Sequence, residues 1–240
     1  MNRITVLLIA SCLTWSISSW SQKKLTLSAF TGSGISFFRG SGAVTNSVYY
    51  RNGLPFPNDV DTMANPYGKK SFTNFLAGLQ ANITLSSKWI LLLSAQYEHT
   101  GGKLTGDSVI SPSGNIKTDG KFSRYYDFIS VNPQIGRMLF QKAVTLTLHT
   151  GIDYTSKLDL GNNFDYKDQT GQKNSIGSQG GEPEKNDLRV TLGATVTRKK
   201  WSVDINYKHG LINYNKYGTG NVYARLLHIR IMYAFLSKKI

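Results

Sequence analysis

Cysteine and long apolar runs are almost absent from this chain. It has 240 residues and one cysteine, Cys12, which lies in an apolar N-terminal leader. Without that leader the mature protein has no disulfide framework, no thiol nucleophile and no cysteine metal site. No later apolar run approaches the length of a membrane-crossing helix, so helical membrane proteins are excluded.

Acidic side chains are also scarce. Asp and Glu number 14 against 28 Lys and Arg, which gives a formal net charge of +14 at pH 7. Such a surplus normally indicates nucleic acid as a partner, but an exported chain does not meet the genome, so we expect no nucleic-acid partner. The same electrostatics attract phospholipid headgroups and lipopolysaccharide phosphates, and we expect outer-membrane lipids as partners.

The N-terminus has the pattern of an export signal. Arg3 precedes the apolar segment Ile4–Leu13, which is too short to span a bilayer as a helix. Ser19 and Ser21 are small residues at the spacing that a signal peptidase needs. We therefore predict cleavage after Ser21 and a mature chain that begins at Gln22.

These expectations divide the chain into a signal peptide, residues 1–21, and one mature domain, residues 22–240. An alternative stays open. Ile9–Cys12 also resembles a lipobox, in which the cysteine is lipidated and becomes the first mature residue. The apolar run continues beyond Cys12 to Trp20, where a polar tether is expected after a lipobox.

Period-two alternation of apolar and polar residues dominates the mature chain. It predicts β-strands with one face toward lipid and the other toward a lumen. In this interpretation Leu93, Leu148 and Ile205 face lipid near the bilayer midplane, and Thr147 faces the lumen. A soluble sandwich or lipocalin-like barrel also alternates, but it hides its apolar face inside. The alternating segments are Leu25–Phe38, Phe75–Leu85, Trp89–Thr100, Phe122–Leu139, Val144–Thr155, Leu188–Val196, Trp201–Leu211 and Val222–Phe235.

Connection lengths support the same architecture. The short connections are Ser86–Lys88, Phe140–Ala143 and Lys199–Lys200. The long polar connections that alternate with them are Arg39–Lys70, Gly101–Gly120, Ser156–Asp187 and Ile212–Asn221. The pattern predicts an all-β fold, an eight-stranded antiparallel up-and-down transmembrane β-barrel with short periplasmic turns and long extracellular loops. Asn52-Gly53 predicts a tight hairpin in the first loop, which leaves a ten-stranded barrel as an alternative.

Two sets of side chains follow from these predicted faces. The first is a polar network in the lumen, because an eight-stranded barrel is just wide enough to be filled by its own side chains. Its expected members are Glu98, His149, Asp153, Arg189, Asp204, Lys208, His228 and Arg230. The second is an aromatic girdle at the two membrane interfaces. Its expected members are Trp89, Tyr97, Tyr125, Tyr154, Trp201, Tyr207, Tyr233 and Phe235.

Several stretches are similar to those of the small outer-membrane β-barrel domain family, the OmpA-like and PorT-like barrels. They are the leader followed by Gln22, the segment Asn65–Gly68, the strand Asp127–Gly136 with Pro133, and the aromatic-rich final strand. The resemblance implies an integral outer-membrane location and recognition by the outer-membrane assembly machinery. It implies little about activity, because such barrels serve as anchors, adhesins, pores, secretion accessories and lipid enzymes.

The residues give no complete catalytic or metal site. His99 and His209 are expected to face outward at the membrane edge, where lipid A deacylases of this architecture keep their histidine, but Ser94 and Ser202 face the other way. Four scattered histidines give no ligand set, and the loop carboxylates Asp59, Asp61, Asp165 and Asp168 lack calcium-loop spacing. We expect no metal and no cofactor.

The loops favour interaction over catalysis. We expect a non-enzymatic envelope anchor with possible protein partners at residues 39–70 and 156–187, and mobility within Gly171–Lys185. Two alternatives stay open: a narrow pore for ions or small solutes, and a deacylase-like lipid-modifying enzyme.

Overall fold

The chain forms one closed ring of antiparallel strands. The computed structural model describes residues 24–50, 62–111, 114–141, 143–167, 170–179, 186–216 and 219–239. The predicted leader with Cys12 and the predicted Asn52-Gly53 turn lie outside these residues. The strands are β1 (Lys24–Arg39), β2 (Asn46–Tyr50), β3 (Thr62–Met63), β4 (Phe72–Thr84), β5 (Trp89–Ser111), β6 (Gly114–Gln141), β7 (Thr145–Lys167), β8 (Lys173–Gln179), β9 (Asn186–Arg198), β10 (Trp201–Gly210) and β11 (Tyr223–Lys239).

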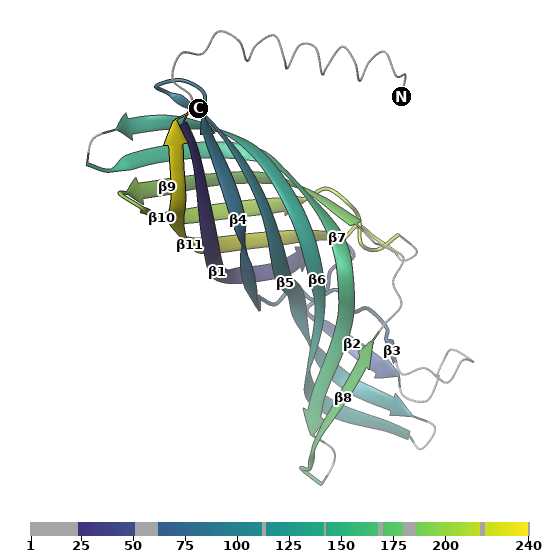
Figure 1. Ribbon diagram of the computed structural model, residues 1–240. Coiled ribbons are helices and arrows are strands. Elements are labelled where there is room, and N and C mark those ends of the chain that lie inside the picture. The colour runs from purple at the N-terminus through teal and green to yellow at the C-terminus, as the bar shows by residue number, and fades with distance from the viewer. Residues whose placement is uncertain are drawn as a thin grey trace.

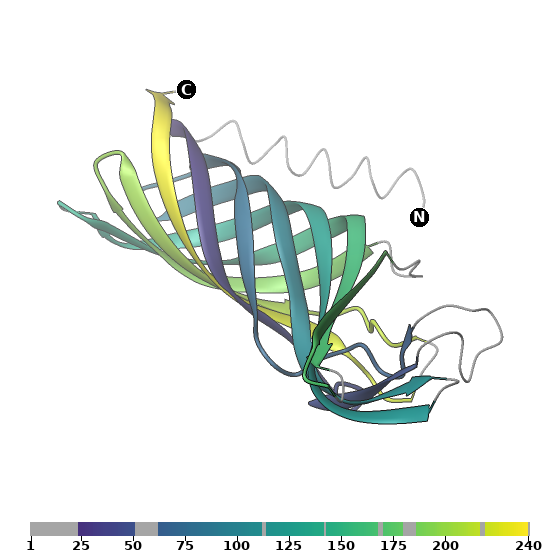
Figure 2. The same ribbon diagram turned by 90° about the horizontal axis from the view of Figure 1, so that it is seen from below.

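Eight of these strands make the barrel. The ring runs β1-β4-β5-β6-β7-β9-β10-β11 and returns to β1, with every neighbouring pair antiparallel. The first and last strands close it along a seam that extends from Lys24↔Lys239 to Arg39↔Tyr223 (Figures 1 and 2). The eight-stranded prediction is confirmed. Within the described residues, no helix is long and apolar enough to cross a membrane.

The outer face of the ring is apolar. Leu148 leaves 47% of its surface exposed on this face, whereas its neighbour Thr147 is 6% exposed inside the barrel. Leu93 and Ile205 also lie on the outer face. Exposing so many large apolar side chains to water is unfavourable. The apolar outer face of the ring is therefore the surface that spans a lipid bilayer.

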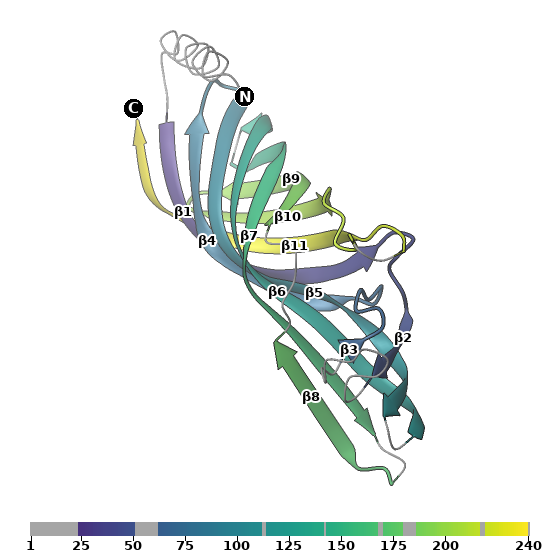
Figure 3. The ribbon, with the colours of Figure 1, turned by 90° about the vertical axis from the view of Figure 1, so that its right-hand side faces the viewer.

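Three barrel strands continue past the ring. β5 and β6 remain paired as far as Ser111↔Gly114, so the expectation of a loop at Gly101–Gly120 is wrong. β7 continues to Lys167 and pairs with β8, a strand that occupies part of the segment expected to be mobile. β2 adds in parallel to β5 and in turn pairs with β3. We call the part of the sheet past the ring the shelf (Figure 3). It consists of β5 after Gly101, β6 before Tyr125 and β7 after Leu160, together with β2, β3 and β8.

The shelf has a small apolar core of its own. Phe164 is its centre, stacked on Tyr49 with ring centroids 4.7 Å apart and on Tyr166 at 5.1 Å. Gly106 and Gly120 make room for the Phe164 ring, because a Cβ at either position would lie within 2.5 Å of a ring carbon. The full core consists of Tyr49, Met63, Leu104, Val109, Phe122, Phe164 and Tyr166.

Polarity therefore reverses along single strands. On β6 the outward residues Ile129 and Val131 are apolar within the ring, and the outward residues Lys117 and Lys121 are charged in the shelf. The inward residues change in the opposite sense, from polar side chains in the ring to Phe122 in the shelf. The reversal indicates that the surroundings of the strand change from lipid to water between these two parts.

Candidate functional site: the charged lumen and its cap

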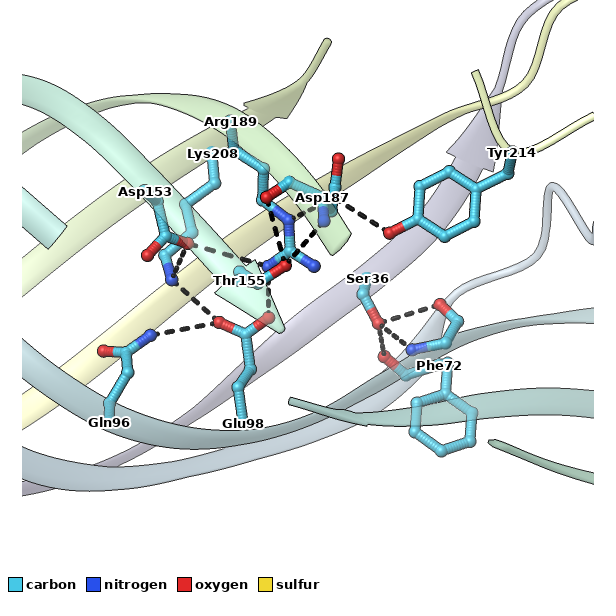
Figure 4. A network of polar contacts seen from close by, with 11 residues as sticks. Ser36, Phe72, Gln96, Glu98, Asp153, Thr155, Asp187, Arg189, Lys208 and Tyr214 are labelled. Atoms are coloured by element: carbon cyan, nitrogen blue, oxygen red, sulfur yellow. Dashed lines mark hydrogen bonds and ion pairs between the residues drawn. The ribbon is translucent and has the colours of Figure 1, made fainter. Parts of the chain in front are cut away.

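Charged side chains from four strands meet in the lumen near the loop end of the ring. Arg189 on β9 donates to Glu98 on β5 and, through Nε, to Asp187 Oδ2 at 2.6 Å. Lys208 on β10 lies 2.8 Å from Glu98 Oε2 and 2.8 Å from Asp153 Oδ2 on β7. All five side chains are buried. We call these five residues the upper network (Figure 4).

Alternation along the strands explains this convergence. Asp187 and Arg189 are separated by one residue on β9 and therefore point to the same face. Asp153 is the register partner of Arg189, which brings its carboxylate to the same depth. Three carboxylates thus surround two cationic side chains. Buried charges need such partners, because an isolated ion in the lumen would cost several kcal/mol.

A second cluster lies closer to the short-turn end. Asp204 on β10 accepts from Arg230 Nε at 2.8 Å and from Thr195 Oγ1 at 2.6 Å, and its Oδ1 lies 2.8 Å from His149 Nε2. Asn206 donates to the other oxygen of the same carboxylate. We call these residues the lower network. The Arg230 guanidinium also lies over the Phe30 ring, 4.8 Å from its centroid.

The lumen between and beside the networks is lined by neutral polar groups. His228 is buried, and neither of its ring nitrogens has a hydrogen-bond partner among the described residues. Other buried polar atoms without such a partner belong to Gln80, Ser94, Gln96, Ser130, Asn132 and Gln134 on β4, β5 and β6. These side chains make the β4, β5 and β6 side of the lumen polar.

An apolar cap closes the lumen on its loop side. Phe38 lies 5.5 Å from Tyr67 and 5.4 Å from Tyr214, measured between ring centroids. The Tyr67 hydroxyl donates to the Tyr214 carbonyl at 2.6 Å, which attaches the Leu211–Val222 connection to the segment before β4. The buried cap residues are Phe38, Ala43, Tyr67, Tyr126, Phe128, Leu160, Tyr214, Val222, Ala224 and Leu226.

The cap is coupled directly to the upper network. The Tyr214 hydroxyl donates to Asp187 Oδ2 at 2.8 Å, and the Arg189 guanidinium lies 5.1 Å from the Phe128 ring centroid. Burial, followed by the nearby Asp187 carboxylate, raises the pKa of Tyr214 well above its ordinary value. Beside the cap, Ser36 links β1 to β5, because its Oγ donates to the Gly101 carbonyl at 2.8 Å (Figure 4).

The structure brings together most of the predicted lumen residues. Glu98, Asp153, Arg189 and Lys208 share the upper network, while His149, Asp204 and Arg230 share the lower one. His228 lies in the lumen but joins neither by a hydrogen bond. Asp187 and Tyr214 were missed by sequence reasoning. The spacing of Asp187 from Arg189 was a usable signal, whereas the position of Tyr214 in a long connection gave none.

The predicted girdle residues lie on the outer face. Trp89, Trp201, Tyr233 and Phe235 lie toward the short-turn end, where the Trp201 and Tyr233 rings are 4.9 Å apart. The residues toward the loop end are Tyr97, Tyr125, Tyr154 and Tyr207. Cations accompany the first group. The Arg137 guanidinium lies 5.9 Å from the Trp89 ring centroid, and Lys200 Nζ lies 5.9 Å from that of Tyr233.

The two outward histidines have partners, but no serine, threonine or cysteine is among the hydrogen-bond partners of their ring nitrogens in the described part of the chain. His99 Nδ1 lies 2.7 Å from Asp127 Oδ1, which also accepts from the Tyr97 hydroxyl at 2.6 Å. His209 Nδ1 lies 3.4 Å from the Tyr207 hydroxyl. Acyl hydrolysis needs a nucleophile within hydrogen-bond reach of such a base.

The described residues also offer no metal centre, because no three of their His, Cys, Asp and Glu side chains are arranged to hold an ion. Among the loop carboxylates named above, Asp165 accepts from Ser175 at 2.7 Å in the shelf. Asp59, Asp61 and Asp168 lie outside the described residues.

The fold and lumen define a membrane-spanning β-barrel with an ion-paired interior. No family model and no curated protein matches the chain. Solved structures similar to it include Ail, the attachment invasion locus protein of Yersinia pestis, in complex with the heparin analogue sucrose octasulfate. That likeness has 12% identity and a TM-score of 0.31 over 89% of this chain and 100% of that one.

Two further solved structures are similar to the chain over most of its length. Neisserial surface protein A, NspA, shares 12% identity at a TM-score of 0.34, with 88% of this chain and 97% of that chain covered. A Pseudomonas aeruginosa FadL homologue shares 9% identity at a TM-score of 0.21, with 92% of each chain covered. These TM-scores are low, so the role of the barrel is inferred from this chain's own residues.

Proposed function

We propose that this protein is a non-enzymatic barrel of the bacterial outer membrane that holds the shelf outside the cell as a binding surface for another protein. The supporting observation is the reversal of polarity along β5, β6 and β7. Strands that only needed to span a membrane would end near the interface. These strands continue as a sheet with its own apolar core and a charged outer face, a construction suited to water.

The edge of the shelf supports the choice of a protein partner. β8 pairs with β7 from Gly161↔Gln179 to Lys167↔Lys173, and no other described strand pairs with its second edge. An open strand edge presents unpaired backbone donors and acceptors, which an extended segment of a partner binds by adding a strand. Lys173 at the start of β8 is the type of charged residue that restrains indiscriminate edge pairing.

The filled lumen argues against the pore alternative. The upper network and the apolar cap are both buried inside the barrel toward its loop end, and a cavity of about 10 Å³ beside Phe38, Tyr126 and Tyr214 has room for about one water molecule. We expect no stable conductance from the purified barrel in single-channel recordings. A steady open-channel current from the unmodified protein would contradict the anchor hypothesis and support the pore hypothesis.

Cysteine labelling tests the orientation. The predicted mature chain has no cysteine, so single substitutions report one position each. A membrane-impermeant maleimide should label Ser175→Cys in the shelf on intact cells and should label Lys199→Cys, in a short turn, only after the outer membrane is opened. The reverse pattern would place the shelf in the periplasm and disprove the proposal.

Site-specific photocrosslinking tests for the partner. A photoreactive residue at position 175, beside the open edge, should give one discrete protein adduct in intact cells. The matched control, the same residue at position 199, should not give that adduct. If position 175 yielded only lipid adducts or none, the shelf would not be a protein-binding surface.

A further inference from the structure

A cationic cluster occupies the lipid-facing side of the barrel at its loop end. Arg225 on β11 is the register partner of Phe37 on β1 and of His209 on β10. Arg39 follows two residues after Phe37, so its side chain leaves the strand on the same face. Three strands thus bring two guanidinium groups and an imidazole to one part of the outer surface.

The contacts inside this cluster leave hydrogen-bond donors free. Arg225 Nη1 lies 3.3 Å from the Tyr207 hydroxyl, and Arg225 Nε is buried without a hydrogen-bond partner among the described residues. The Arg39 guanidinium lies over the Phe37 ring, 4.8 Å from its centroid. Phe37 therefore separates two guanidinium groups that are held in place by aromatic side chains.

Among the described residues of β9, β10, β11 and β1, no carboxylate lies on the outer face of the barrel. Asp187 and Asp204 are the only acidic residues of β9, β10, β11 and β1, and both are buried in the lumen. The opposite wall differs, since Asp127 and Asp159 accompany its outward side chains near the loop end. Near the loop end of the ring, Arg39 and Arg225 therefore have no outward carboxylate beside them on their own strands.

Apolar side chains lie directly below the cluster, toward the membrane centre. Ile35 and Leu227 are register partners, and both leave more than two fifths of their surface exposed on the outer face. Ile205 and Ile229 continue this surface. Cations above an apolar wall match a ligand that has a charged head and hydrocarbon tails. A free anion would use only the cations, so the apolar wall favours a lipid.

We propose that Arg39, Arg225 and His209 bind the phosphomonoester of a lipid A-type glycolipid, whose acyl chains lie against Ile35 and Leu227. A phosphomonoester carries about −1.5 to −2 charges at pH 7 and three acceptor oxygens, which matches two guanidinium groups better than a singly charged phosphodiester. This site rests on the proposed function, because it takes the loop end of the barrel to face the outer leaflet.

Native mass spectrometry of the detergent-solubilised protein tests the site. The probes are diphosphoryl lipid A, the same lipid after enzymatic dephosphorylation, phosphatidylglycerol, and inorganic phosphate as a competitor. Diphosphoryl lipid A should remain bound, and Arg39→Ala/Arg225→Ala should weaken its binding about tenfold or more, because each removed cation made charge-assisted hydrogen bonds. Arg198→Ala, an exposed cation at the other end of the barrel, serves as the control and should not alter binding.

The remaining outcomes overturn the proposal. Equal retention of dephosphorylated lipid A or of phosphatidylglycerol would show that no phosphomonoester is selected. Displacement by millimolar inorganic phosphate would identify a site for free phosphate. Unchanged binding by the double variant, with the barrel shown to be folded by circular dichroism, would place the lipid elsewhere. Detergent imposes no orientation, so these results are independent of the cysteine labelling that tests the proposed function.

Discussion

The ring and the shelf are built from the same strands with opposite polarity. Within the ring, β5, β6 and β7 place apolar residues outside and polar residues inside; in the shelf they place Phe122 and Phe164 inside and lysines outside. The hydrogen-bonded ladder continues between the two parts apart from local irregularities. The side-chain pattern of these strands therefore follows the solvent around them, whereas the same backbone pairing is kept in lipid and in water.

The largest effect on this comparison is expected from removing a charge inside the ring. Arg189→Ala leaves Glu98 and Asp187 without their shared cation, and breaking a buried pair in this way costs about 3–5 kcal/mol. Unfolding titrations in lipid vesicles measure the loss, with Arg198→Ala as an exposed control expected to stay within about 0.5 kcal/mol. A harmless Arg189→Ala would mean that the upper network does not hold the lumen together. We also expect this variant to raise conductance above the unmodified baseline.

The shelf should respond to loss of its apolar centre without affecting the ring. Phe164→Ala removes the ring that contacts Tyr49 and Tyr166 and should destabilise the shelf by about 3 kcal/mol. Limited proteolysis should then cleave within the shelf while the barrel stays intact in the membrane. If the variant instead unfolded as a whole, the shelf and the ring would be one cooperative unit, and the shelf would have no stability of its own.

The outer face offers the direct test of the change in solvent. Leu148→Arg, near the predicted bilayer midplane, should cost about 2–4 kcal/mol in vesicle unfolding titrations. Ser123→Arg, outward on β6 in the shelf, should change stability by less than about 0.5 kcal/mol, because arginine there meets water. Equal costs at the two positions would contradict a boundary between them.

A smaller effect is expected at the junction of cap and network. Tyr214→Phe removes the hydrogen bond to Asp187 and should cost about 1.5 kcal/mol near neutral pH. Because the pKa of Tyr214 is raised in the folded state, its contribution is complete below tyrosine's ordinary pKa of about 10 and is lost as the pH rises above it. Between pH 9 and pH 11 the free energy of unfolding should therefore fall less in Tyr214→Phe than in the unmodified protein. An equal fall in both proteins would show that Tyr214 is not the source of this pH dependence.

The sequence predicts the ring because alternation can be read from each strand by itself. Lipid on one side of the strand and polar groups on the other require this alternation over the whole length of the strand. It failed on Gly101–Gly120, since glycine, serine and lysine in a water-exposed sheet look like a loop when the partner strand is unknown. Lumen contacts such as Lys208 with Asp153 depend on register around the ring, which sequence does not supply. Leu76 and Leu92 also lie inward, where strict alternation predicts no apolar residue, and Leu76 packs there with Phe30 and Met232.

The seam between β1 and β11 has a consequence for the kinetics of folding. It joins the beginning and the end of the described chain, so its pairs close a loop that contains all the other barrel strands. Contacts of such long sequence separation carry the largest loop-closure entropy and are slow to form. Until they form, β1 and β11 each expose an unpaired edge that lipid cannot satisfy. We therefore expect closure of this seam to limit the rate at which the barrel matures, and substitutions along it to alter folding speed.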